Sequence, residues 1–303
     1  MSMPNFFIIG AAKSGTSSLY HYVIQHPQVY GSKKKEPSFF AFEGRPSFNG
    51  PGDQEFNRSV VTDIDEYHSL FDGAAGETAI GEGSAVYLYS PQAPVRIHSY
   101  APRARLIAIL RNPFERAYSA FAHQRRDGYE PERDFHRALE LEEERITQNW
   151  QHLWHYKNVG LYGAQLERYL NCFSREQILI TAYEEFVLQP DKVLRDVFSH
   201  LGVDVDFRPD MSYRHNVSGT PRSRLVHDFL RRDGAVKSSI KPLIPSRLRL
   251  AVRRALFAAN VRQQRSEAHF GPAYDYLYST YRKDIDRLGQ LLHRDFRYWL
   301  HPQ

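Results

Sequence analysis

The sequence predicts an α/β fold in which helices flank a parallel β-sheet, with a helical, basic C-terminal elaboration. Continuous apolar runs at 5–9, 105–110 and 177–181 have the length and composition of buried strands. Helical signals follow each run. Strands that alternate with helices imply parallel pairing through right-handed crossovers.

The elements can be justified in chain order. Thr16 to about His26 follows the first strand as a helix, and 33–57 reads as an irregular, aromatic-rich loop. After the second strand, Asn112 as N-cap and Pro113 at the first helical position predict a helix start. The other expected elements are helices at 66–71, 92–100, 134–150, 162–173 and 191–201 and a strand at 79–84. We expect Glu140 and Glu142 to Glu144 to form a solvated face of the helix at 134–150.

Composition sets the broad class. The chain has 303 residues, 42% of them hydrophobic, which suffices for a packed core. We expect a single domain over 1–303, with a core at about 5–222 and a helical part at about 223–303. The one cysteine, Cys172, excludes an intrachain disulfide, and no run approaches the roughly 20 apolar residues of a spanning helix. These features favour a cytoplasmic protein, and the net charge of +5 suits an anionic ligand.

The turn from Gly10 to Gly15 has the composition of an anion-binding loop. A strand, a glycine-rich turn and a helix N-terminus offer free backbone N–H groups and a helix dipole to a phosphate. In the ATPase form a lysine follows the second glycine, whereas here Thr16 holds that position and Lys13 lies inside the turn. We therefore expect a P-loop-type sheet in which Lys13 approaches a single 5′-phosphate. The alternative is an ordinary turn with an exposed lysine.

A second motif runs from Arg111 to Ser119. Arg111 stands at the carboxyl end of an expected strand, where open α/β sheets place ligands, and Ser119 lies two turns into the next helix. An arginine fork and a hydroxyl suit a phosphate monoester. The alternative is an arginine ion-paired at a strand end, with the serine packed between helices.

Together these motifs resemble a known family. Residues 6–19, 26–27, 34–40 and 110–119 resemble the PAPS-dependent sulfotransferases, most closely the heparan-sulfate-type branch and its bacterial relatives. The resemblance covers roughly residues 5–222. It implies transfer of a sulfuryl group from the co-substrate 3′-phosphoadenosine-5′-phosphosulfate (PAPS) to an acceptor hydroxyl, with 3′-phosphoadenosine 5′-phosphate (PAP) as product and no metal.

The resemblance also implies residue roles. Lys13 would contact the bridging oxygen and stabilise the charge on the leaving 5′-phosphate. Glu82 matches a catalytic base in Ile80 to Leu88, and Lys35 would neutralise the sulfuryl oxygens. The residues implied to bind the donor are Lys13, Ser14, Gly15, Thr16, Ser17, Ser18, Arg111, Ser119, Tyr162, Ser218, Gly219 and Arg222. The alternatives are a surface carboxylate at Glu82, a solvated lysine run at 33–35, and a histidine base among His21, His26 and His123.

Other functions and partners stay open at this stage. A P-loop nucleotide kinase is the second enzyme reading, but the displaced lysine argues against it. A non-catalytic nucleotide- or nucleic-acid-binding protein is the third, although no stacking-aromatic RNA motif or zinc finger accompanies the positive charge. The acceptor could be a glycan, a lipid or polyketide, or a small natural product. The basic stretch 222–265 could touch a membrane or an anionic surface, or form a packed helix with a solvated face. The sequence leaves the oligomeric state undetermined.

Overall fold

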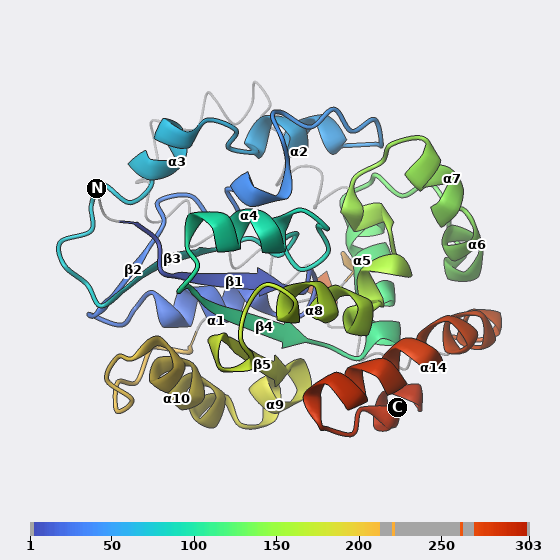
Figure 1. Ribbon diagram of the computed structural model, residues 1–303. Coiled ribbons are helices and arrows are strands. Elements are labelled where there is room, and N and C mark those ends of the chain that lie inside the picture. The colour runs from blue at the N-terminus through green and yellow to red at the C-terminus, as the bar shows by residue number, and fades with distance from the viewer. Residues whose placement is uncertain (1–2, 213–219, 222–260, 263–269, 302–303) are drawn as a thin grey trace, which may run out of the picture.

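A five-stranded parallel sheet in the order β2-β3-β1-β4-β5 forms the centre of the computed structural model (Figure 1). The structure describes residues 3–212, 220–221, 261–262 and 270–301. The strands are β1 (Phe6–Gly10), β2 (Val29–Gly31), β3 (Ala79–Gly83), β4 (Arg105–Leu110) and β5 (Ile178–Ala182). A short antiparallel pair joins β6 (Thr220–Pro221) to β7 (Val261–Arg262). The predicted α/β class and parallel pairing are confirmed.

Helices cover both faces of this sheet. In order they are α1 (Thr16–Val23), α2 (Asp53–Ser59), α3 (Ile64–Ser69), α4 (Ala93–Tyr100), α5 (Pro113–Arg126), α6 (Phe135–Glu140), α7 (Glu142–Thr147), α8 (Tyr162–Leu170), α9 (Tyr183–Leu188), α10 (Pro190–Leu201) and α14 (Pro272–Leu292). Short 3₁₀ turns are η1 (Phe39–Ala41), η2 (His152–Trp154), η3 (Asn158–Gly160), η4 (Arg175–Gln177) and η6 (Arg297–Leu300). Within the described ranges, no helix is both long and apolar enough to cross a bilayer.

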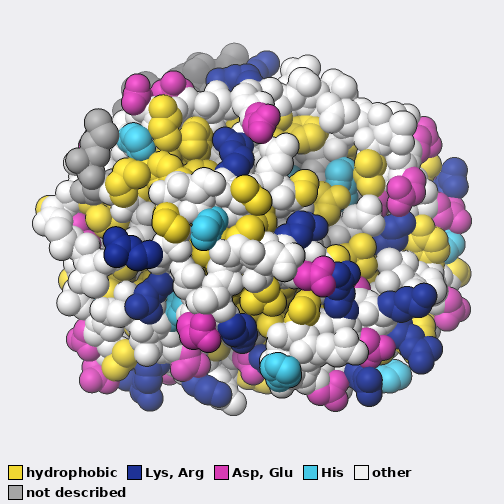
Figure 2. All heavy atoms as spheres, in the orientation of Figure 1, with side chains coloured by type: hydrophobic (Ala, Val, Ile, Leu, Met, Phe, Trp, Pro, Cys, Tyr) yellow, Lys and Arg dark blue, Asp and Glu magenta, His cyan; other side chains and the backbone are white. Residues whose placement is uncertain are grey.

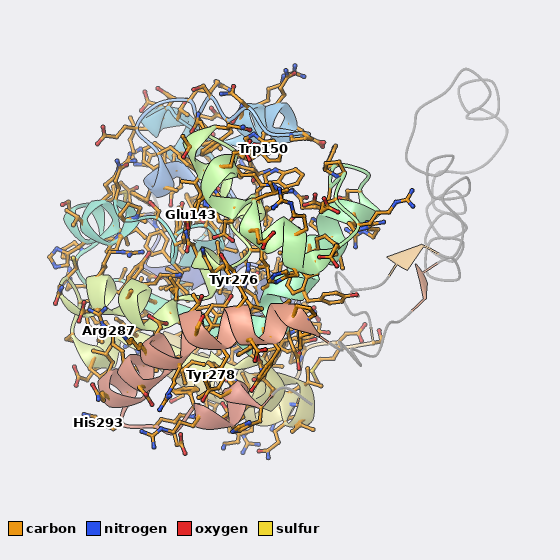
Figure 3. All side chains as sticks on the ribbon, turned by 90° about the vertical axis from the view of Figure 1, so that its right-hand side faces the viewer. Glu143, Trp150, Tyr276, Tyr278, Arg287 and His293 are labelled. Carbon is orange, nitrogen blue, oxygen red and sulfur yellow. The ribbon has the colours of Figure 1, made fainter. Side chains whose placement is uncertain are left out.

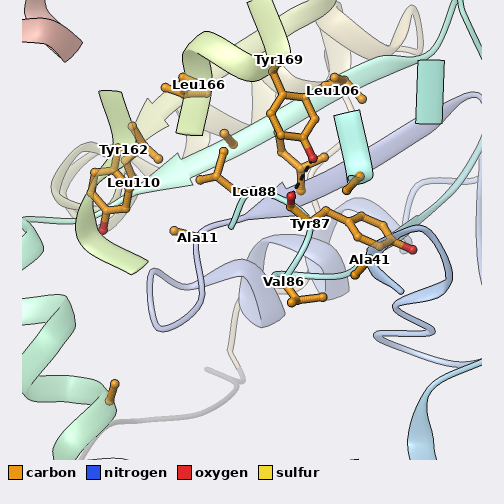
Figure 4. Packing of buried hydrophobic residues seen from close by; sticks show 14 of the residues in the cluster. Ala11, Ala41, Val86, Tyr87, Leu88, Leu106, Leu110, Tyr162, Leu166 and Tyr169 are labelled. Atoms are coloured by element: carbon orange, nitrogen blue, oxygen red, sulfur yellow. Dashed lines mark hydrogen bonds between the residues drawn. The ribbon is translucent and has the colours of Figure 1, made fainter. Parts of the chain in front are cut away.

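Alternation along β1 divides the core into two layers. Phe7 and Ile9 point to the face covered by α4, α8 and α14, whereas Phe6 and Ile8 point to the face covered by α1 and α10. Figure 4 shows part of the first layer, where the Tyr169 hydroxyl of α8 donates to the carbonyl of Tyr87 at 2.9 Å. All five residues of β1 are buried, as a central parallel strand requires.

The expected helix at 134–150 is wrong in two respects. The chain forms two short helices, α6 and α7, which meet at Leu141. Glu142, expected in a solvated face, is fully buried. Its carboxylate accepts the backbone N–H groups of Lys157 and Asn158 at 2.5 and 2.8 Å, and these bonds satisfy the buried oxygens.

Candidate functional site

The loop between β1 and α1 holds the first group of expected ligand-binding residues. Gly15 is the N-cap of α1 with φ 90°, and α1 has no side-chain cap, so its first N–H groups remain available to an anion. A Cβ atom at Gly15 would lie 3.1 Å from the Tyr183 ring, and one at Gly10 would lie 2.7 Å from the Leu88 Cβ. Both glycines are therefore needed for close packing at this turn.

Lys13 and Ser14 lie within this turn. Burial lowers the pKa of Lys13 to about 7, and the positive charge of Arg126 adds to the effect. Ser14 Oγ is fully buried and lies close to the Tyr162 hydroxyl, but it makes no hydrogen bond of good geometry to the described residues. A buried hydroxyl without a partner fits a site completed by a ligand oxygen. Thr16, Ser17 and Ser18 follow in the first turn of α1.

The second motif lies at the end of β4 and along α5. Asn112 caps α5 as predicted, because its side chain accepts the N–H of Phe114 at 3.0 Å. The Arg111 Nε and Nη2 atoms donate to Glu115 Oε2 at 3.1 and 2.8 Å. Ser119 is buried two turns into α5.

Tyr183 and Tyr162 connect the two motifs. β1 and β4 are neighbours in the sheet, so both loops open at the same edge. The guanidinium of Arg111 lies 4.9 Å from the centre of the Tyr183 ring, which also packs on Gly15. The hydroxyl of Tyr162 donates to the carbonyl of Arg111 at 3.0 Å. The structure thus brings Lys13, Ser14, Gly15, Arg111 and Tyr162 together.

Sequence reasoning missed two residues here. Tyr183 directly follows β5, so the rule that ligands bind at the carboxyl ends of strands could have found it. Arg116 is fully buried, and its Nη2 donates to the carbonyl of Tyr156. The Nε and Nη1 atoms of Arg116 have no partner among the described residues. A buried guanidinium with two unsatisfied nitrogen atoms is costly, so the surroundings of Arg116 favour a bound anion.

Glu82 lies at the end of β3 and is fully buried. Its oxygens accept hydrogen bonds from the hydroxyls of Tyr87 at 2.5 Å, Ser84 at 2.7 Å and Tyr67 at 3.4 Å. Burial raises the pKa of Glu82 to about 7, although these hydrogen bonds oppose the shift. A carboxyl group with this pKa can exchange a proton near neutral pH.

Lys35 and Glu36 belong to a segment that lies close to Glu82. Lys35 Nζ is 2.7 Å from Glu36 Oε1, and the side chain of Glu36 is 36% exposed. The backbone N–H of Ser38 donates to Ser84 Oγ at 3.0 Å, which ties this segment to the partner of Glu82. The negative charge of Glu36 contributes to the raised pKa of Glu82.

The remaining expected site residues have different outcomes. Ser218, Gly219 and Arg222, and most of the basic stretch 222–265, lie outside the described residues. His26 is unsuited to be a base, because its ring nitrogens lie 2.9 Å from the Asp204 carbonyl and 3.0 Å from the Gln28 N–H. The described part of the chain contains no cluster of His, Cys, Asp and Glu that could hold a metal ion.

Comparison with known proteins gives consistent matches. A family model described as the sulfotransferase domain matches residues 3–227. The mouse protein named bifunctional heparan sulfate N-deacetylase/N-sulfotransferase 4 is 31% identical over 211 residues, which are 66% of this chain and 22% of that protein. A Xenopus laevis relative, bifunctional heparan sulfate N-deacetylase/N-sulfotransferase 1, is 32% identical over 205 residues, with the same 66% and 22% coverage. The chain therefore spans about a fifth of the length of these curated relatives.

A solved structure covers nearly the whole chain. The crystal structure of a sulfotransferase from Alicyclobacillus acidocaldarius is 36% identical, has a TM-score of 0.77 and covers 99% of both chains. The family match is consistent with the parallel sheet and with the two loops that open at one of its edges. The chain belongs to the sulfotransferase family.

Proposed function

We propose that this chain transfers a sulfuryl group from PAPS to an acceptor nucleophile. The observation that carries the proposal is the contact of the Tyr183 ring with both Gly15 and Arg111. This contact places the anion-binding turn next to an arginine that is suited to bind a phosphate. Two such sites at one sheet edge suit a nucleotide with phosphates at both its 5′ and 3′ positions. The unpartnered Ser14 hydroxyl and the buried charge of Arg116 support the same ligand.

The proposed chemistry is an in-line displacement at sulfur. The bond between sulfur and the bridging oxygen breaks, a bond from sulfur to the acceptor atom forms, and the acceptor proton passes to a base. Lys13 would stabilise the negative charge on the leaving 5′-phosphate, and Lys35 would face the sulfuryl oxygens. The N–H groups and hydroxyls of 14–18 would hold the 5′-phosphate, and Arg111 with Ser119 the 3′-phosphate. PAPS is then a co-substrate, and the proposed reaction needs no metal.

The acceptor atom is oxygen or nitrogen. The sequence favours a hydroxyl, whereas the curated relatives are named as N-sulfotransferases. Either nucleophile loses a proton as its bond to sulfur forms, so both need a base. Assays should therefore include alcohols and amines.

Two carboxylates are candidates for the base. Glu82 has a suitable pKa, but it is fully buried and three hydroxyls already occupy its oxygens. Glu36 is partly exposed and forms an ion pair with Lys35. A base must come within about 3 Å of the proton it accepts. These exposures favour Glu36 as the carboxylate that contacts the acceptor, and Glu82 remains the base only if the segment at 36–38 moves.

Two measurements test the reaction class. Wild-type protein should bind PAP and transfer labelled sulfate from PAPS, whereas Lys13→Ala should lose at least about a hundredfold in kcat, as expected for the loss of one transition-state donor. Absence of PAP binding would refute the proposal. Magnesium-dependent ATP turnover would favour the kinase, and salt-sensitive retention of DNA or RNA without PAP binding would favour a nucleic-acid-binding protein.

Matched substitutions separate the two carboxylates. Glu36→Gln should keep PAP affinity and reduce transfer by about a hundredfold or more, as removal of a general base does. Glu82→Gln should retain transfer within about tenfold if Glu82 only supports the site. The reverse pattern would identify Glu82 as the base, and unimpaired transfer by both variants would exclude both carboxylates as the base.

A further inference from the structure

We infer that three phenylalanines, Phe42, Phe48 and Phe56, form an aromatic shelf that binds an uncharged, apolar body of the acceptor. This inference rests on the proposed sulfuryl transfer and specifies the class of acceptor. It also gives the loop at 33–57 a role in acceptor binding.

The shelf is a contiguous set of ring contacts. The ring centres of Phe42 and Phe48 are 5.7 Å apart, those of Phe42 and Phe56 5.9 Å, and those of Phe48 and Phe56 6.0 Å. All three side chains are only partly buried. Figure 2 shows hydrophobic side chains reaching the surface near α2 and α4. Aromatic rings that stay partly exposed as a group often mark binding surfaces.

Hydrogen bonds hold the shelf in place. Asn57 accepts the backbone N–H of Phe48 at 3.1 Å and donates to its carbonyl at 2.9 Å. Asp53 is fully buried and accepts the N–H of Gly50 at 2.9 Å, that of Gln151 at 2.8 Å and the indole N–H of Trp154 at 3.1 Å. The segment at 48–57 is thus fixed within itself and to η2, and a preorganised surface costs less entropy on binding.

The η2 turn joins the shelf to the anion-binding turn. On one side, the His152 ring lies 5.4 Å from the Phe56 ring. Leu153, the next residue, belongs with Tyr89 to an apolar cluster around Ala12 and Ala85. Ala12 directly precedes Lys13 and Ala85 follows the Glu82 segment. A chain of contacts through η2 therefore connects the shelf to the turn that carries Lys13.

The two histidines along this path are neutral at pH 7. Burial lowers the pKa of His152 to about 3 and that of His155 to about 4. The His155 Nδ1 atom is 2.9 Å from the Tyr89 hydroxyl, and its Nε2 lies 3.0 Å from the Trp150 carbonyl. Aromatic rings and neutral imidazoles favour a hydrocarbon or aryl body over an anionic chain.

The test compares acceptors that share a nucleophile and differ in their apolar body. With 1-octanol and ethanol as probes, kcat/KM should favour 1-octanol by at least about tenfold, because each buried methylene adds to binding. Phe48→Ala and Phe56→Ala should each reduce that preference about tenfold through KM, leaving PAP affinity and ethanol turnover unchanged. Phe48→Leu should restore most of the preference. Leu188→Ala removes an apolar side chain that is 78% exposed on α9 and serves as the matched control.

A second readout is independent of transfer. Saturation-transfer NMR should detect 1-octanol binding to the wild type without donor, and the Phe48→Ala/Phe56→Ala double variant should lose the signal. Equal turnover of both alcohols, preference for a polyanionic glycan fragment, or octanol binding that survives in the double variant would each overturn the inference. Failure to bind PAP with retained octanol binding would refute the sulfuryl transfer and leave the shelf intact.

Discussion

At the scale of single residues, Lys13 connects the shape of the loop to its chemistry. Its backbone φ is 71°, its side chain is half-buried, and partial desolvation of the ammonium group lowers its pKa to about 7. An unpaired charge there is unfavourable until an anion arrives. Donor binding should therefore be coupled to protonation of this side chain.

This coupling predicts proton uptake on PAP binding. Bound phosphates stabilise the charged lysine, so the pKa of Lys13 should rise in the complex and PAP affinity should fall as pH increases above about 7. The fall should approach tenfold per pH unit until the pKa of the bound state is reached. Calorimetry at pH 8 in buffers of different ionisation enthalpy measures the uptake.

Two variants check that Lys13 is the group that titrates. Lys13→Arg should bind PAP without this uptake, because its guanidinium is already charged. Lys13→Met should bind more weakly and should also lack it. Undiminished uptake in both variants would assign the proton to another group.

At the scale of elements, the regular parts of the fold were predictable and the connections were not. The strands at 6–10, 105–110 and 178–182 are continuous apolar runs, and the α5 start has local capping signals. β2 is three residues long, too short to show a period, and α9 directly follows β5 without a turn signal. The break between α6 and α7 depends on burial of Glu142, a tertiary effect that the local pattern does not reveal.

The candidate site also contains residues that local motifs predict and residues that only the fold brings in. Arg111, Ser119 and the 10–18 turn belong to local motifs, so sequence alone could identify them. Tyr183 directly follows β5, and it joins the site because β4 lies between β1 and β5 in the sheet and its ring fills the space above Gly15. The burial of Glu82 depends on Tyr67, which lies in α3 and is brought in by the fold.

Asp53 gives an element-scale prediction, since it joins the start of α2 to η2. Asp53→Ala should lower the free energy of unfolding by about 3 kcal/mol, because three buried N–H groups lose their acceptor. Urea denaturation measures the change. Glu55→Ala, at an exposed position of the same helix, should change stability by less than about 0.5 kcal/mol. Equal effects would mean that Asp53 does not anchor the turn.

At the scale of the whole molecule, the C-terminal helix α14 is packed against the sheet domain. It lies across the side of the molecule below α6 and α7, as Figure 3 shows, with Tyr276 facing that side. Asp284 of α14 accepts the N–H groups of Gly163 and Ala164 at 2.8 and 2.9 Å. These are the first turn of α8, so α14 supplies a cap that α8 itself lacks.

The same contact links stability to the proposed donor site, since α8 begins at Tyr162. Asp284→Ala should lower the free energy of unfolding by about 2 kcal/mol and weaken PAP binding. Asp286→Ala, which removes only a surface ion pair with Arg297, should cost less than about 1 kcal/mol and leave PAP binding unchanged.

Urea unfolding followed by fluorescence and circular dichroism should show one coincident transition if residues 1–303 form a single domain. Two separate transitions, with Asp284→Ala shifting only one, would instead show that α14 unfolds independently of the sheet.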